Sequence, residues 1–338
     1  MQSEALTNEL KGNLFEYLVG LHLARLYGVE GQFLTSFAGG LKERLLGYER
    51  QLRRSNPQLL VDLMTLASAT SNKIKASQNE ECSVKNISII GKLHGGRSKN
   101  LDYGEADLLL IQEQQIVTPI SIKLAKEGSY VNTKSGGVNT FLSRYFASCL
   151  DAGHWQERLI QELEQSFFLM GATLYEMVGM EFNGTFGAEW GESGLSDLPG
   201  QLDRRMRRVI FHHYHNVISV IYNAFVHFFS SSYHPFIQST LPLLGLGGAD
   251  NLAQFSCFYN NKVAPSSETH SMINLSRVTY FDRATMLDQL PQIELLQLKD
   301  EVSSFELALA DYLLQIRVKP MNAFTTMGLK INCSLKIR

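Results

Sequence analysis

The sequence lacks the features that identify several common classes of protein. Its 4 cysteines lie far apart among 338 residues, so they indicate neither a C-x-x-C zinc or redox motif nor a disulfide framework. No uninterrupted run of about 20 apolar residues suits a membrane span, and the first residues lack the basic-then-apolar order of a secretory signal. We therefore expect a reduced, cytoplasmic protein with no membrane partner.

The sequence also lacks an excess of charge of either sign. It has 31 Lys and Arg against 33 Asp and Glu, a formal net charge of -2, so a nucleic-acid-binding surface would have to be local. No segment fits the phosphate-binding loop G-x-x-x-x-G-K-[ST], which argues against an ATP-driven motor. The whole sequence has 44% hydrophobic and 19% charged residues, a composition that is typical of a globular protein.

Hydrophobic patterning predicts a mixed α/β chain. Helices are expected at 7–28 and 41–68, the second broken near Pro57. Three β-rich segments between 84 and 125 predict a meander, and a polar loop follows at 126–139. The remaining expected elements are helices at 155–180, 203–231 and 284–317, and strands at 253–262, 271–282 and 328–338.

One hairpin of this meander, residues 104–126, carries a lysine inside an apolar strand. A turn centred on Gln114 pairs residues whose numbers sum to 228, so Asp107 lies opposite Ser121 and Lys123 shares their face. A lysine in a buried strand is costly unless an anion compensates it. The alternative is a solvent-facing pair on an edge strand, which Pro119 favours because proline is awkward in a central strand.

A second acid in an unexpected place favours a functional site. Glu16 lies on the helix at 7–28, whose other positions are nearly all apolar and should reject a carboxylate. Two acids and a lysine around a hairpin can form a site for a metal ion and water.

These residues resemble the PD-(D/E)xK nuclease superfamily, which includes type II restriction endonucleases, Holliday-junction resolvases and transposon-end nucleases. The resemblance rests on Glu16, on Asp107 at a strand start and on the Ser-Ile-Lys sequence at 121–123, and it covers about residues 7–146. It implies a restriction-endonuclease-like core, a mixed sheet flanked by helices. It also implies that Asp107 and Glu16 bind Mg²⁺ and that Lys123 orients or activates the attacking water, as hydrolysis of a phosphodiester requires.

The sequence departs from the family pattern at one position. Ser121 stands where the family usually has Asp or Glu two residues before the lysine, and a hydroxyl is a weak, neutral ligand. Ser121 therefore joins Asp107, Lys123 and Glu16 as a candidate catalytic residue. Either Glu16, Glu105 or Glu113 compensates for the missing acid, or the site is inactive.

Basic residues flank the hairpin on both sides and are suited to phosphate contacts, although each segment could equally be a solvated loop. The DNA-binding candidates are Lys92, His94, Arg97, Lys99, Lys126 and Lys134. The histidines at 212, 213 and 215 lack the spacing of a metal site, so we interpret them as packed or groove-lining. The basic run 204–208 could contact phosphate but is more often simply solvated.

The sequence thus predicts an α/β protein with a nuclease core at 1–182 and a mostly helical half at 183–338 that serves DNA binding or oligomerisation. The preferred function is an Mg²⁺-dependent endonuclease that acts on DNA, with restriction-type cleavage as the leading subclass. A structure-specific repair, recombination or phage nuclease is the nearest alternative, and an inactive nucleic-acid-binding scaffold is the other. Cleavage of both strands of a duplex would favour a homodimer.

Overall fold

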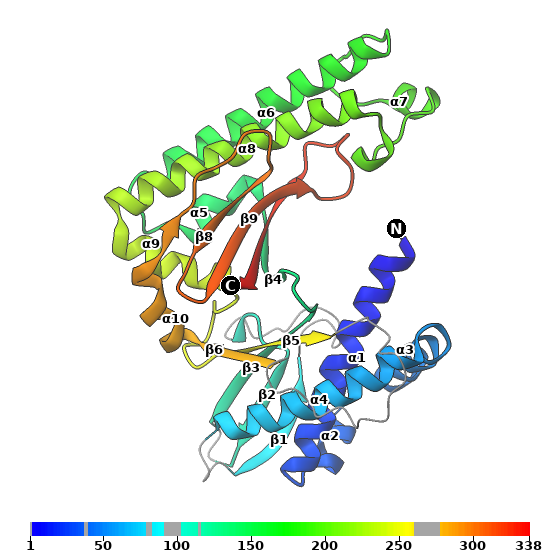
Figure 1. Ribbon diagram of the computed structural model, residues 1–338, viewed down its shortest axis with the longest axis vertical. Coiled ribbons are helices and arrows are strands. Elements are labelled where there is room, and N and C mark those ends of the chain that lie inside the picture. The colour runs from blue at the N-terminus through cyan, green and yellow to red at the C-terminus, as the bar shows by residue number, and fades with distance from the viewer. Residues whose placement is uncertain (1, 37–39, 79–82, 91–102, 114–115, 260–277) are drawn as a thin grey trace. The chain divides into compact units, whose positions relative to one another are not determined.

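The computed structural model describes residues 2–36, 40–78, 83–90, 103–113, 116–259 and 278–338, with side chains from residue 10 onward. It divides into two compact units, the first of residues 1–131 and 245–286 and the second of residues 132–244 and 287–338. Each contains a five-stranded sheet with helices, so the fold is mixed α/β (Figure 1). Within the described ranges, no helix has the length and apolarity to cross a membrane.

The first unit contains four helices and five strands within the described residues. The helices are α1 (Gln2–Leu26), α2 (Glu30–Thr35), α3 (Leu41–Ser55) and α4 (Pro57–Ser77), and the strands are β1 (Val84–Ile89), β2 (Leu108–Gln112), β3 (Val117–Lys126), β5 (Ala253–Tyr259) and β6 (Val278–Asp282). The predicted break at Pro57 is confirmed. Proline suits the first position of a helix, and the side chain of Asn56 caps α4 by accepting a 3.0 Å hydrogen bond from the Leu59 amide.

The sheet of the first unit has the order β1-β2-β3-β5-β6. The neighbours β1, β2 and β3 are antiparallel, as expected of a meander, whereas β3 pairs with β5 in parallel. In the hairpin, Leu108 pairs with Ile120 and Leu110 with Thr118, so the predicted register, with a sum of 228, is confirmed. The strand β3 is therefore central and the edge-strand interpretation is wrong; Pro119 is accommodated because the pairing with β5 begins only at Ile120.

The predicted boundary at residue 182 does not match this division. Strands β5 and β6 come from the region 183–338 yet complete the sheet that begins with β1. The glycine-bearing segment 183–200, which was the candidate boundary, lies inside the second unit. The parallel ladder between β3 and β5 joins residues about 130 apart in sequence, a pairing that hydrophobic patterning does not specify.

The second unit carries a sheet of order β4-β10-β9-β8-β7, against which α8 packs. Its strands are β4 (Val131–Gly137), β7 (Glu294–Leu295), β8 (Ser304–Ala308), β9 (Tyr312–Pro320) and β10 (Leu329–Ile337). Its helices are α5 (Phe141–Tyr145), α6 (Ala152–Met177), α7 (Ala188–Glu192), α8 (Arg204–Ser231) and α9 (Tyr233–Thr240), with α10 (Arg283–Gln289) at the boundary between the units. Short 3-10 turns occur at η3 (Val138–Thr140), η4 (Pro199–Gln201), η5 (Leu241–Leu244) and η7 (Leu290–Gln292).

Two sequence-based expectations for this unit are wrong. The polar segment 126–139 contains the strand β4, and the helix expected at 284–317 is confined to α10, followed by β7, β8 and part of β9. In β8 and β9, buried residues alternate with more exposed ones, which is the period of a strand. The chain after residue 183 is therefore mixed rather than mostly helical.

His213 is buried at the contact between α6 and α8, with 2% of its surface exposed. Burial lowers the pKa of His213 to about 4, because the apolar surroundings disfavour the charged imidazolium. Its ring contacts Phe167 and its Nδ1 lies 2.7 Å from Ser166 Oγ. His213 is thus a packed residue, as the sequence indicated.

We expect His213 to make the second unit sensitive to acid. The unfolded chain takes up a proton near pH 6.5 whereas the folded chain resists it until about pH 4, so stability falls as the pH drops between these values. The loss is about 3 kcal/mol. Urea unfolding from pH 7 to pH 4 should show a weaker pH dependence in His213→Gln than in the wild type, whereas His212→Gln, an exposed neighbour, should leave it unchanged. An equal dependence in all three proteins would contradict this assignment.

Candidate hydrolytic site

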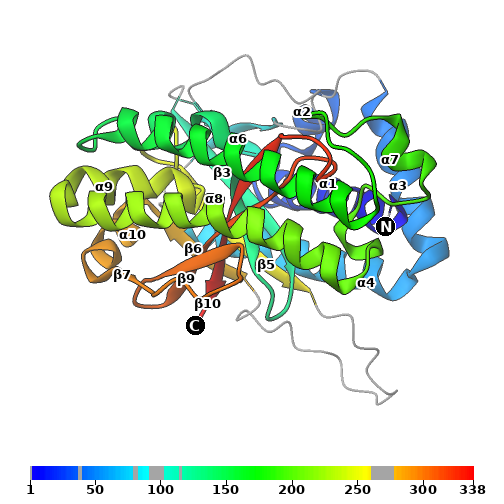
Figure 2. The ribbon, with the colours of Figure 1, turned by 90° about the horizontal axis from the view of Figure 1, so that it is seen from above.

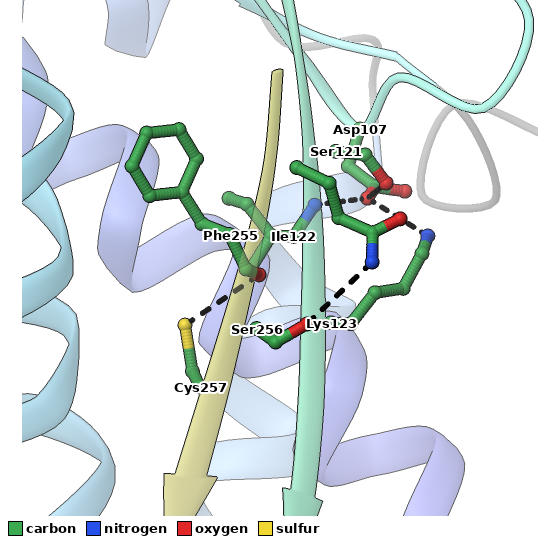
Figure 3. A network of polar contacts seen from close by, with 8 residues as sticks. Asp107, Ser121, Ile122, Lys123, Phe255, Ser256 and Cys257 are labelled. Carbon is green, nitrogen blue, oxygen red and sulfur yellow. Dashed lines mark hydrogen bonds and ion pairs between the residues drawn. The ribbon is translucent and has the colours of Figure 1, made fainter. Parts of the chain in front are cut away.

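The two faces of β3 differ in chemistry. Ile120 and Ile122 pack into the apolar core together with residues of α1 and α4. Ser121 and Lys123 point to the opposite face by the alternation of a strand, and Figure 3 shows Lys123 on the other side of the strands from Phe255 and Cys257. The polar residues therefore occupy a face of their own.

The position of Asp107 follows from where β2 begins. Strand β2 starts at Leu108, but β3 continues to Lys126, so beyond Ile120 the edge of β3 is no longer paired with β2. The Asp107 carboxylate takes the place of a strand partner there, since its Oδ2 accepts a 2.6 Å hydrogen bond from the Ile122 amide. This bond fixes the carboxylate beside the part of β3 that β2 does not pair.

The same oxygen of Asp107 collects two further groups. Ser121 Oγ and Lys123 Nζ each lie 3.4 Å from Oδ2 (Figure 3). The side chains of Lys123 and Asp107 are 18% and 16% exposed, so both charges are largely withdrawn from water. Since such burial is costly for an isolated charge, the two residues compensate each other, as the hairpin register predicted.

Acids around Lys123 keep it protonated. Burial by itself would lower the pKa of Lys123. The negative charges of Asp107, Glu105 and Glu16 outweigh burial, and the pKa of Lys123 is raised above its ordinary value. The lysine is therefore a cation at neutral pH, available to attract an anion.

Glu16 belongs to this electrostatic environment. It is half-buried on α1, which packs against the Ile120 and Ile122 face of the sheet. Its charge contributes to the raised pKa of Lys123, after those of Asp107 and Glu105. Helix α1 thus lies on the face of the sheet opposite to Ser121 and Lys123, and Glu16 acts on Lys123 through its charge.

Sequence reasoning missed one part of this polar face. Gln254 and Ser256 of β5 pair with Ser121 and Lys123 in the parallel ladder and so share their face. Both are buried, and Gln254 Nε2 donates a 3.5 Å hydrogen bond to Ser256 Oγ. Gln254 Oε1 is buried without a hydrogen-bond partner among the described residues, which is rare for a carbonyl oxygen. The alternating polar positions of β5 were the available signal.

The donor atoms suit a hard divalent cation. Mg²⁺ takes one or two carboxylates, keeps several waters and often binds substrate phosphate as well. Carboxylates of Asp107 and Glu16 and the amide oxygen of Gln254 are ligands of this kind. Among the described residues, no group of three or more His, Cys, Asp and Glu could hold a metal ion, so the site would depend on water and phosphate to complete the shell.

The other predicted site residues are distributed as follows. Lys92, His94, Arg97 and Lys99 lie outside the described residues. Lys126 is exposed at the end of β3, whereas Lys134, half-buried in β4 of the second unit, lies over the ring of Tyr145 at 5.7 Å. Glu113 is exposed at the far end of β2 from Asp107, so of the three acids proposed to compensate for Ser121, Glu16 and Glu105 are the ones that act on Lys123.

Comparison with known proteins gave no relative. No family model matches the chain, and neither a curated protein nor a solved structure matches it.

Proposed function

We propose that the chain is an Mg²⁺-dependent endonuclease that hydrolyses DNA phosphodiester bonds at Asp107 and Lys123. The observation that carries the proposal is the largely buried Asp107–Lys123 pair, 3.4 Å between Oδ2 and Nζ, beside the part of β3 that β2 does not pair. An apolar pair would be the cheaper choice in a sheet that needed only stability. The order of a helix-borne acid, an acid before β2 and a lysine within β3 also supports a restriction-endonuclease-like core.

Each residue has a distinct role in this proposal. Asp107 and Glu16 would hold Mg²⁺, which when bound supplies positive charge to the scissile phosphate and makes water more acidic. Protonated Lys123 attracts the phosphate and stabilises the negative charge that develops on it. Asp107 also keeps the ammonium in place, because its own carboxylate is fixed by the Ile122 amide.

The buried amide of Gln254 supports the same role from β5. Its Oε1 offers a neutral oxygen on the face of Ser121, the position where the family pattern has an acid. We propose that Gln254 and the acid Glu105 together compensate for the missing carboxylate. The alternative is an inactive nucleic-acid-binding scaffold, and it is favoured by the serine at 121 in place of the acid of the family pattern.

Ser121→Ala is expected to be tolerated far better than Asp107→Ala. The Ser121 hydroxyl makes one long, 3.4 Å hydrogen bond, so its removal should cost about 1 kcal/mol or less, roughly a fivefold loss of rate. Asp107→Ala removes a carboxylate from the metal site as well as the acceptor for Ile122. Single-turnover cleavage of plasmid DNA measures both rates, and equal losses would show that Ser121 takes part directly.

Incubation of the purified chain with plasmid, phage and branched DNA in Mg²⁺ tests the function and its subclass. Discrete fragments from the plasmid and phage DNA would indicate restriction-type cleavage. Preference for the four-way junction would indicate a structure-specific nuclease. Binding without cleavage of any of the substrates would support the scaffold and contradict the proposal.

A further inference from the structure

A groove in the second unit lies along α6 and α8, which run side by side in both views (Figures 1 and 2). Its first hollow has a volume of about 400 Å³, a common size for a ligand pocket. The walls are apolar at Leu169, Met170 and Val209, and Arg205 and Arg208 stand at the same hollow. A ligand that fits must combine an apolar body with negative charge.

The buried side chain of His213 in this hollow has a nitrogen, Nε2, that lacks a hydrogen-bond donor among the described residues. Ser166 Oγ donates its single proton to the Glu162 carbonyl at 2.6 Å, so it must accept from His213 Nδ1, 2.7 Å away. A neutral imidazole protonated on Nδ1 leaves Nε2 as an acceptor, and burial holds His213 neutral. Nε2 is buried without a partner among the described residues, and His213 lines the hollow. A ligand with an N–H or O–H group would satisfy it.

The positive charge continues beyond the first hollow. A second hollow of about 400 Å³ shares Arg208 and His212 with the first and adds Arg204, Arg207, Phe211 and a single acid, Glu301. Four arginines of α8 thus follow one another along the groove, and guanidinium groups recognise phosphate well. The ring of Phe211 is 39% exposed, so it offers a flat surface. The positive charge of the arginines therefore extends far enough to contact more than one phosphate of a ligand.

We propose that this groove binds a nucleotide unit of single-stranded DNA. The base lies against the apolar wall and donates an N–H group to His213 Nε2, the phosphates contact the arginines, and the next base stacks on Phe211. Nε2 is covered in this structure, so the base must displace neighbouring side chains; the unbranched Met170 and Met177 in the wall repack readily. A fatty acid lacks the donor, and inorganic phosphate lacks the apolar body.

The binding site is separate from the hydrolytic site, because its residues all belong to the second unit. A fluorescent 12-nucleotide oligothymidine strand, titrated in EDTA so that no cleavage occurs, measures it by anisotropy. The double variant Arg205→Gln/Arg208→Gln should bind at least tenfold more weakly, and the slope of log K against log salt should fall by about 1.4. The double variant Arg144→Gln/Arg158→Gln carries the same change of charge outside the groove and should bind like the wild type.

The contact with the base is tested separately. An abasic strand with the same phosphates should bind the wild type more weakly than oligothymidine. Leu169→Gln should reduce this preference for the strand that carries bases, whereas Leu150→Gln, at a similarly exposed position, should preserve it. Equal binding of the two strands would reduce the groove to a simple anion patch and overturn the proposal. Equal losses of affinity in the two arginine double variants would also overturn the proposal. So would competition by thymidine monophosphate at the same concentration as oligothymidine, because the ligand would then be a free nucleotide.

Discussion

Asp107→Asn is expected to lose Mg²⁺-dependent cleavage by more than about 10³-fold, the largest effect of any substitution in the chain. Removing one group that stabilises developing charge typically costs about 10²–10³-fold, and Asp107, which holds Lys123, would also bind the proposed metal. The fold should survive, because the asparagine side-chain oxygen can still accept from the Ile122 amide. Single-turnover cleavage across an Mg²⁺ series measures the loss.

Glu113→Gln is the matched control for this variant. Glu113 follows the same strand but is exposed at its other end, so its charge should not matter for the reaction. Equal losses in Asp107→Asn and Glu113→Gln would show that the effect is one of net charge on the hairpin. Unchanged cleavage by Asp107→Asn would remove Asp107 from the site.

Lys123→Ala should reduce cleavage by about 10²–10³-fold while DNA affinity stays within about twofold of the wild type. In the proposed reaction the lysine would act on one phosphate, whereas affinity would come from many contacts along the DNA backbone. Asp107 keeps its hydrogen bonds from Ile122 and Ser121, so the variant should remain folded. Affinity is measured by gel shift with Ca²⁺ in place of Mg²⁺, and thermal unfolding checks the fold.

Lys126→Ala, a substitution on the same strand, is expected to have the opposite effect, on DNA binding rather than on cleavage. Lys126 is exposed three residues further along β3, so its loss should weaken binding and reduce the salt dependence, while cleavage of saturating DNA is unchanged. If Lys123→Ala cleaves at the wild-type rate, Lys123 serves only to compensate Asp107 in the fold.

The hairpin was predictable because its information is local. The turn length and the alternation between Leu108 and Lys123 determine the register, and the register by itself brings Asp107 next to Ser121 and Lys123. The break before Pro57 is local as well, since proline and the Asn56 cap act within one turn of the helix.

Other features depend on pairings between distant residues. Residues 132–244 of the second unit separate the two strands of the parallel ladder that pairs Ser121 with Gln254. Neither the division into units nor the position of Gln254 beside Ser121 could therefore be read from composition. The helix expected at 284–317 was wrong for another reason. Leu309, Leu313 and Ile316 are spaced by four and three residues and so fit a helical stripe, but cross-strand pairing selects the period of two.

Conversion of supercoiled plasmid by the purified wild-type chain, in Mg²⁺ and in EDTA, tests the central claim most directly. If the Asp107–Lys123 pair is a metal-dependent hydrolytic site, nicked and linear plasmid should accumulate in Mg²⁺ and not in EDTA, and Asp107→Asn should leave the plasmid supercoiled in both. Plasmid that is bound but stays supercoiled in Mg²⁺, or cleavage that persists in EDTA or in Asp107→Asn, would contradict the account.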